Sequence, residues 1–201
     1  MGKLKDSILK DSILCVQNGN SCLDTKNYQQ AIKEFSKALN MNPVNVEACN
    51  GLGIAYAFLE KKEPAIESFK KAAEINPEDP EAYFNLGVIY TSLKKYQQAI
   101  ICYQKVLTID PKDIEALKGL AMAHEFLSDY RLAIVYYNKA IVEDTNDAET
   151  YFRLGVAHSY LEEHKEAAAN LDKAKKLFKE QGDIKRSQAL ERLIAENPKA
   201  D

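Results

Sequence analysis

Residues 80–113 read PEAYFNLGVIYTSLKKYQQAIICYQKVLTIDPKD and carry two apolar stripes separated by a short polar stretch. Apolar side chains recur every three or four positions in residues 83–93 and again in residues 96–107. This spacing is typical of an amphipathic α-helix. Pro111 predicts the end of the second helix, because proline fixes its own φ and has no N–H to donate. The stretch therefore predicts two helices joined by a turn.

The same pattern recurs every 34 residues along the chain, in five columns that share this period. They comprise Ala31, Ala65, Ala99, Ala133 and Ala167; Gly19, Gly53, Gly87, Ala121 and Gly155; Pro43, Pro77 and Pro111; Phe35, Phe69, Tyr103, Tyr137 and Leu171; and Ala38, Ala72, Val106, Ala140 and Ala174. A fixed period of this length indicates stacked structural units. The small residues are expected to let the two helices of a unit approach closely, with the aromatic side chains filling the space beside them.

We predict five repeats between an amino-terminal extension and a carboxy-terminal cap. The extension covers residues 1–11, the repeats cover 12–45, 46–79, 80–113, 114–147 and 148–181, and a capping helix with a tail covers 182–201. Gly182 is expected in a left-handed conformation, and Asp183 is expected to cap a helix over 183–196. The short tandem KDSILKDSIL can lengthen the first helix or fray.

This pattern resembles the tetratricopeptide repeat, whose signature is W-x₂-L-G-x₂-Y, then A-x₃-F, then P within 34 residues. Residues 83–90 match as Tyr-x₂-Leu-Gly-x₂-Tyr, and Ala99, Tyr103 and Pro111 supply the remainder. The resemblance covers residues 12–181. It implies an all-α fold, a right-handed α-solenoid (superhelix) of five helix-turn-helix repeats, in which the first helix of each repeat lines a concave groove.

Composition limits the classes of function. The chain has 201 residues, 46% hydrophobic and 28% charged, with a formal net charge of −3. A hydrophobic fraction this high argues against a disordered chain, and the even balance of charge argues against a nucleic-acid partner. No apolar run approaches the roughly 20 residues of a transmembrane helix, and the amino terminus lacks the apolar stretch of a secretory signal. We therefore expect a soluble, cytoplasmic protein.

No residue pattern indicates a cofactor, a metal or a catalytic site. The four cysteines show no zinc-binding spacing, three of them lie in packing columns, and their low density suits a reducing compartment. His124 and His158 share one column, where a metal or pH-sensitive pair is an alternative to packing in place of tyrosine. We favour packing, and we expect no enzymatic activity and no cofactor.

The resemblance places a set of residues in the groove. They are Asn50, Ile54, Phe58, Phe84, Asn85, Val88, Lys118, Met122, Phe126, Phe152, Arg153, Val156 and Tyr160. Their apolar members form a candidate binding strip, although Phe84 and Phe152 have packing between repeats as an alternative role. The acidic column of Glu47, Glu81, Glu115 and Glu149 is better explained by the helix dipole than by ligand recognition.

These residues predict a non-catalytic interaction scaffold that binds a peptide or helical segment of a partner through apolar anchors. Family members that bind the carboxylate tail of chaperones use a clamp of lysine, asparagine and arginine. Here Val16, Gly51 and Glu81 stand at clamp positions, so a chaperone tail is not expected as the partner. The alternative is a homo-oligomeric scaffold, in which a terminal helix such as residues 1–14, apolar at Leu4, Ile8, Leu9 and Ile13, docks in a neighbour's groove.

Overall fold

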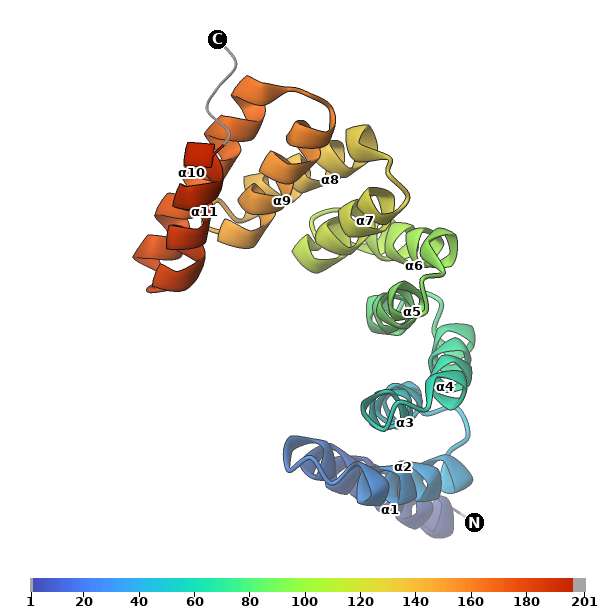
Figure 1. The fold of residues 1–201 in the computed structure, drawn as a ribbon. Helices are drawn as coiled ribbons and strands as arrows, with labels where there is room; N and C mark the ends of the chain where they lie inside the picture. The colour runs from blue at the N-terminus through green and yellow to red at the C-terminus, as the bar shows by residue number, and fades with distance from the viewer. Residues whose placement is uncertain (1, 197–201) are drawn as a thin grey trace. The chain divides into compact units, whose positions relative to one another are not determined.

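The computed structural model describes residues 2–196, with side chains described for residues 7–194. Within this part every regular element is a helix, which confirms the predicted all-α fold (Figure 1). The helices are α1 (Gly2–Asp24), α2 (Tyr28–Met41), α3 (Val46–Phe58), α4 (Lys62–Ile75), α5 (Pro80–Ser92), α6 (Tyr96–Ile109), α7 (Ile114–Phe126), α8 (Tyr130–Glu143), α9 (Ala148–Tyr160), α10 (His164–Glu180) and α11 (Ile184–Glu196).

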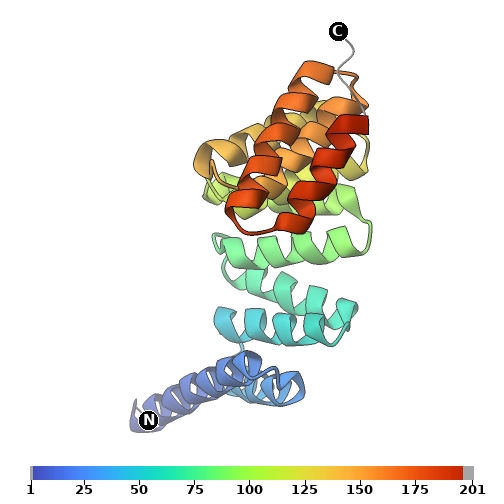
Figure 2. The same cartoon turned by 60° about the vertical axis from the view of Figure 1, so that its left-hand side comes forward.

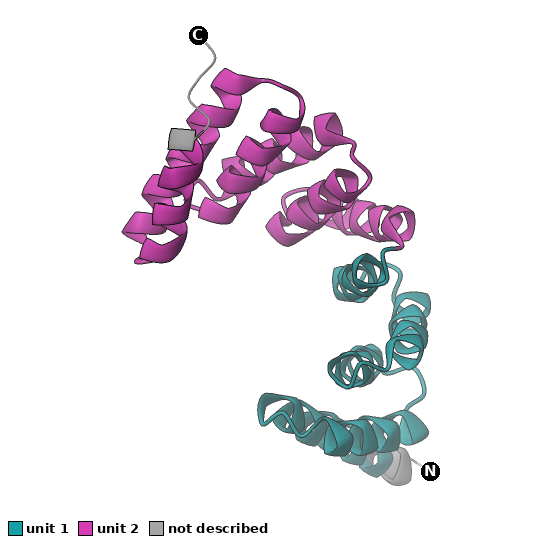
Figure 3. Ribbon diagram, viewed as in Figure 1, with its two compact units in different colours: residues 1–94 teal, residues 95–201 magenta. Residues whose placement is uncertain are grey.

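The chain divides into two units, Met1–Lys94 and Lys95–Asp201, which we describe separately (Figure 3). In unit 1 each helix from α1 to α5 packs on the next, and α3 also contacts both α1 and α5. In unit 2 each helix from α6 to α11 packs on the next, and α10 and α11 lie side by side in both views (Figures 1 and 2). Consecutive stacking of helix pairs is the arrangement expected of a helical-repeat solenoid.

Side-chain caps begin most of these helices. Asn45 Oδ1 accepts a hydrogen bond from the Ala48 N–H at 2.8 Å, and Asp113 Oδ1 accepts one from the Ala116 N–H at 2.7 Å. Such caps satisfy N–H groups that have no partner inside the helix. The turn within each repeat passes through a left-handed residue at φ 57–61°, at Lys26, Glu60, Lys94, Ser128 and Glu162.

Glycines that face the aromatic column leave room for its rings. A Cβ at Gly53 would lie 2.6 Å from the ring of Phe69, and a Cβ at Gly119 would lie 2.5 Å from the ring of Tyr103. The Phe35 ring is fully buried and contacts the backbone positions of both Gly19 on α1 and Gly51 on α3. Phe35, Phe69 and Tyr103 therefore pack where a glycine leaves space for the ring.

The two ends of the described chain differ. At the amino end α1 begins at Gly2, so the tandem lengthens the first helix, and the Leu4 side chain lies outside those described. Along α1 the side chains of Ile8, Leu9, Ile13 and Leu14 are exposed. At the other end Gly182 has φ 80°, as predicted, and Asp183 Oδ1 accepts the Arg186 N–H at 3.1 Å. The helix that follows buries Leu190 against α10.

Candidate interaction surface

Three predicted groove residues are exposed rings stacked on tyrosines. Each is the last residue of a first helix, and each tyrosine begins the second helix of the preceding repeat. The ring centroids of Tyr28 and Phe58, Tyr96 and Phe126, and Tyr130 and Tyr160 lie 4.7, 4.9 and 4.4 Å apart. We call these three sets the aromatic pairs. Phe58, Phe126 and Tyr160 remain 62%, 49% and 64% exposed, so each pair presents a ring to solvent.

The tyrosines of the aromatic pairs were missed by the sequence reasoning. Tyr28, Tyr96 and Tyr130 share the 34-residue period, and each lies 30 residues before its partner. At the second and third repeats the same two columns hold Lys62 and Ser92 instead of rings. A search for aromatic residues 30 apart would have found the pairs, because that spacing joins neighbouring repeats.

The remaining apolar residues of the predicted strip are less exposed. Val88 is exposed, whereas Ile54, Phe84, Met122, Phe152 and Val156 are half-buried. Met122 packs on the core cluster that contains Tyr137, and Phe152 packs on the cluster that contains Phe178. These residues combine packing with partial access to solvent. For Phe152, the contact with the cluster that contains Phe178 supports the alternative role in packing between repeats.

In unit 1 the predicted groove residue Asn50 donates hydrogen bonds to carboxylates. Asn50 is only 3% exposed, and its Nδ2 donates to Asp79 Oδ2 at 2.9 Å and to Glu81 Oε2 at 3.4 Å. Glu47 Oε1 accepts from Asn20 Nδ2 at 2.8 Å. Burial raises the pKa of Glu81, and the negative charges of Asp79 and Glu47 add to this rise. We call Glu47, Asp79 and Glu81 the carboxylate cluster. The other predicted polar residue of this unit, Asn85, is half-buried on α5.

In unit 2 Lys118 pairs with two carboxylates. Its Nζ lies 2.9 Å from Asp147 Oδ2 and 3.1 Å from Glu115 Oε1. Burial alone would raise the pKa of Asp147, but hydrogen bonds from Lys118 and Thr150 outweigh it and hold this pKa below its ordinary value. The Lys118 ammonium is therefore already neutralised within the chain.

Arg153 is also engaged within unit 2. Its Nε lies 3.1 Å from Glu149 Oε1, and its Nη1 lies 3.4 Å from Glu125 Oε2. The hydroxyl of Tyr137 donates to the same Glu125 oxygen at 2.6 Å. Arg153 thus joins α7, α8 and α9, and any ligand that binds it must share it with these carboxylates.

The histidines and cysteines have local packing partners. The His124 ring stacks on Tyr136 at 5.7 Å, and His158 Nδ1 lies 2.6 Å from Glu163 Oε2. Cys49 is buried, and this burial raises the pKa of its thiol. No group of three His, Cys, Asp or Glu side chains within the described residues is arranged to hold a metal ion. None of the described helices combines the length and the apolar character needed to cross a membrane.

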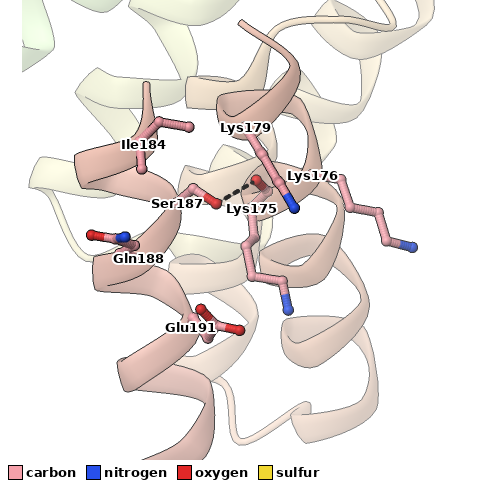
Figure 4. Close-up of a pocket in the computed structure, with 7 residues that line it drawn as sticks. All are labelled: Lys175, Lys176, Lys179, Ile184, Ser187, Gln188 and Glu191. Carbon is pink, nitrogen blue, oxygen red and sulfur yellow. Dashed lines mark hydrogen bonds between the residues drawn. The ribbon is translucent and has the colours of Figure 1, made fainter. Parts of the chain in front are cut away.

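The surface clefts of the described part of unit 2 include two that were not predicted from the sequence. One, of about 280 Å³, lies between α10 and α11, where Ser187 Oγ donates to the backbone oxygen of Lys175 at 3.1 Å (Figure 4). Its lining is Lys175, Lys176, Lys179, Ile184, Ser187, Gln188 and Glu191. The other, of about 330 Å³, is lined by Gln104, Leu107, Thr108, Pro111, Leu117, Leu120, Tyr136 and Lys139. The first has charges of both signs, since Glu191 faces the lysines and Lys175 pairs with Asp172 at 3.0 Å.

Three solved structures illustrate the likeness of this chain to known folds. A MamA structure is 25% identical over 82% of this chain and 96% of that chain, with a TM-score of 0.78. MamA from Desulfovibrio magneticus RS-1 is 22% identical over 85% and 97% of the two chains, with a TM-score of 0.79. YrrB, described as a TPR protein with an unusual peptide-binding site, is 21% identical over 95% of this chain and 97% of that chain, with a TM-score of 0.77.

Family models agree with these structures. One tetratricopeptide repeat model matches residues 80–113, and a second matches residues 14–45 and 148–181. A TPR repeat model matches residues 60–93. No curated protein matches the chain at a significant level. The repeat signature, the stacked helix pairs and the matching models agree: the chain belongs to the tetratricopeptide repeat family.

Proposed function

We propose that the protein is a non-catalytic interaction scaffold that binds a peptide or helical segment of a partner protein on the faces of its first helices. The observation that carries this proposal is the set of aromatic pairs. Each pair holds a largely exposed ring on one repeat by stacking it on the tyrosine of the preceding repeat. An exposed apolar surface at recurring positions is typical of a binding site.

The stacking gives these rings a physical advantage as anchors. A ring packed face to face on its neighbour has little rotamer freedom to lose when a ligand docks on its outer face. Phe126 and Tyr160 stand on consecutive repeats of unit 2, so a segment lying across both would meet two anchors. For a short segment we expect a dissociation constant in the micromolar range, which corresponds to a binding free energy of about −8 kcal/mol.

Removal of the exposed rings tests the proposal. We expect the triple variant Phe58→Ala/Phe126→Ala/Tyr160→Ala to lose a specific set of partners from a cell lysate, measured by quantitative mass spectrometry of captured proteins. The matched control Ile101→Ala/Val142→Ala removes exposed apolar side chains from second helices and should keep those partners. Circular dichroism checks that both variants are folded. Identical partners for all three proteins would contradict the proposal.

The second candidate function is self-assembly through α1. It is favoured by one observation, the exposure of Ile8, Leu9, Ile13 and Leu14 along this helix. We expect the molar mass from light scattering to rise with protein concentration, and Leu9→Asp/Ile13→Asp to hold it at the monomer value. A constant monomer mass for the wild type would exclude this function.

We also propose that the protein works in a reducing compartment such as the cytoplasm. Cys15, Cys22 and Cys49 are free thiols in the structure, which supports this location. Localisation of a fluorescent fusion is the direct test.

A further inference from the structure

Two sets of polar residues occupy equivalent positions two repeats apart but differ in charge. A shift of 68 residues superimposes Glu47, Asn50, Asp79 and Glu81 on Glu115, Lys118, Asp147 and Glu149. The three carboxylates are present in both sets, whereas a neutral asparagine replaces the lysine in the first. The same shift superimposes Asn85 on Arg153, so a second cation is also replaced by asparagine.

In unit 2 all three equivalent carboxylates are paired with cations. Lys118 Nζ lies 3.1 Å from Glu115 and 2.9 Å from Asp147, and Arg153 Nε lies 3.1 Å from Glu149. The backbone positions therefore suit a cation among these carboxylates, and in this unit the chain supplies it.

In unit 1 the carboxylate cluster has only neutral donors. Asn20 donates to Glu47, and Asn50 donates to both Asp79 and Glu81. Among the described residues of this unit no lysine or arginine is ion-paired with any of the three carboxylates. Negative charges held close together without a counterion repel one another, and a nearby cation would relieve this repulsion.

The side chain of Asn50 provides a second, independent observation at the carboxylate cluster. Asn50 is only 3% exposed, and its Oδ1 is buried without a hydrogen-bond partner. The orientation of the amide follows from the carboxylates, because Asp79 and Glu81 both require its N–H groups. A buried oxygen without a donor is unfavourable. A cation on the two carboxylates would supply their donors and allow the amide to turn its oxygen toward the ligand.

We infer that the carboxylate cluster of unit 1 binds an arginine or lysine side chain of the partner segment, at the position that the Lys118 ammonium occupies in unit 2. This inference rests on the proposed function and adds the chemistry of the partner, which carries a basic residue. Guanidinium and ammonium groups suit the cluster because they only donate hydrogen bonds, and carboxylate oxygens only accept them.

Small basic probes test the inference on the full chain. We expect Nα-acetyl-arginine amide or Nα-acetyl-lysine amide to shift the NMR signals of the Asn50 side-chain amide and of the backbone amides of Glu47 and Glu81, saturably at millimolar concentration. The neutral Nα-acetyl-glutamine amide should not shift them. Equal shifts with the neutral probe, or no saturable shift with either basic probe, would overturn the inference.

Charge variants locate the binding. We expect Glu47→Gln/Glu81→Gln to weaken binding of the basic probe about tenfold, as charge-assisted hydrogen bonds are lost. The control Glu67→Gln/Glu74→Gln removes two exposed charges from α4 of the same unit and should bind the probe normally. Asn50→Lys should fold and abolish binding, because its own ammonium takes the place of the ligand. Unchanged binding in folded Asn50→Lys, or in Glu47→Gln/Glu81→Gln, would overturn the inference.

Two further results separate this inference from its alternatives. Saturation of the same amide signals by CaCl₂ or MgCl₂ at lower concentration than the basic probe would identify an ion site and overturn it. A partner that is captured equally by wild type and Glu47→Gln/Glu81→Gln, but lost by the aromatic triple variant, would support the scaffold function and overturn the basic-residue site. Loss of that partner in both variants supports both.

Discussion

At the scale of single residues, Gly53 shows why the small-residue columns exist. Phe69 occupies the space where a side chain at position 53 would lie, and a Cβ there would approach the ring to 2.6 Å. The ring is almost fully buried. We expect Gly53→Leu to lower the free energy of unfolding by about 1–3 kcal/mol through overpacking, measured by chemical denaturation.

The control for Gly53→Leu adds the same bulk at an exposed position. Ala169 lies on the solvent side of α10, and Ala169→Leu should change the free energy of unfolding by less than about 0.5 kcal/mol. Equal losses of unfolding free energy in the two variants would show that a larger side chain at position 53 does not clash with Phe69.

Lys118 provides a pH-dependent prediction at the same scale. Asp147 has a pKa below the ordinary 3.8, so its stabilising contribution is present at neutral pH and is lost as the pH falls through the lowered pKa. We expect Lys118→Met to cost about 1–3 kcal/mol at pH 7, because it leaves Asp147 half-buried without its cation. The loss relative to wild type should shrink as the pH is lowered toward about 2.

A second lysine provides the control. Lys112 pairs with Glu143 at 3.3 Å, but its side chain is 75% exposed. Lys112→Met should therefore cost no more than about 1 kcal/mol at pH 7. Denaturation of both variants across the pH range checks the prediction, and a pH-independent loss in Lys118→Met would contradict it.

At the scale of helices, the aromatic pairs act as contacts between neighbouring repeats. Tyr130 begins α8 and Tyr160 ends α9, and their rings are nearly parallel at an interplanar angle of 4°. The equivalent positions on α4 and α5 hold Lys62 and Ser92, so this junction lacks a ring pair. The junction between α4 and α5 is therefore a place where a stack can be added.

We expect Lys62→Tyr/Ser92→Phe to stabilise the protein by about 0.5–1.5 kcal/mol more than the sum of the two single variants, which is the usual coupling of a stacked ring pair. A double-mutant cycle in urea measures this coupling. Strictly additive single variants would mean that the two positions do not bring their rings together.

The repeat helices were also the part best predicted from sequence. Their periodicity located both helices of residues 80–113, and the glycine column marked the contact between Gly53 and Phe69. These features are local, because each depends on spacing within one repeat. The aromatic pairs were only half predicted, since Phe58, Phe126 and Tyr160 were identified without the tyrosines that hold them.

At the scale of the whole molecule, α11 closes a stack that would otherwise expose an apolar face. Leu190 on α11 is buried against Leu177 and Phe178 of α10. We expect Leu190→Asp to lower the free energy of unfolding by about 3 kcal/mol or more, because it buries an unpaired charge at this contact. Increased binding of an apolar dye would report the opened face.

The control for the cap is Arg192→Asp, which places the same side chain at an exposed position of α11. It should leave both stability and dye binding close to those of the wild type. If Leu190→Asp behaves in the same way, α11 does not protect the apolar face of α10.

The sequence by itself determined the repeat family, the helix pair of each repeat, the glycine and aromatic columns, and the left-handed turn at Gly182 with its Asp183 cap. Each of these follows from spacing within one repeat or from the conformational limits of single residues. Only the tertiary structure decided that Asn50 is buried among carboxylates, that Lys118 and Arg153 are already paired, and which rings stack. Those outcomes depend on how closely neighbouring repeats pack, and residues about 30 positions apart in sequence meet only when the repeats are stacked.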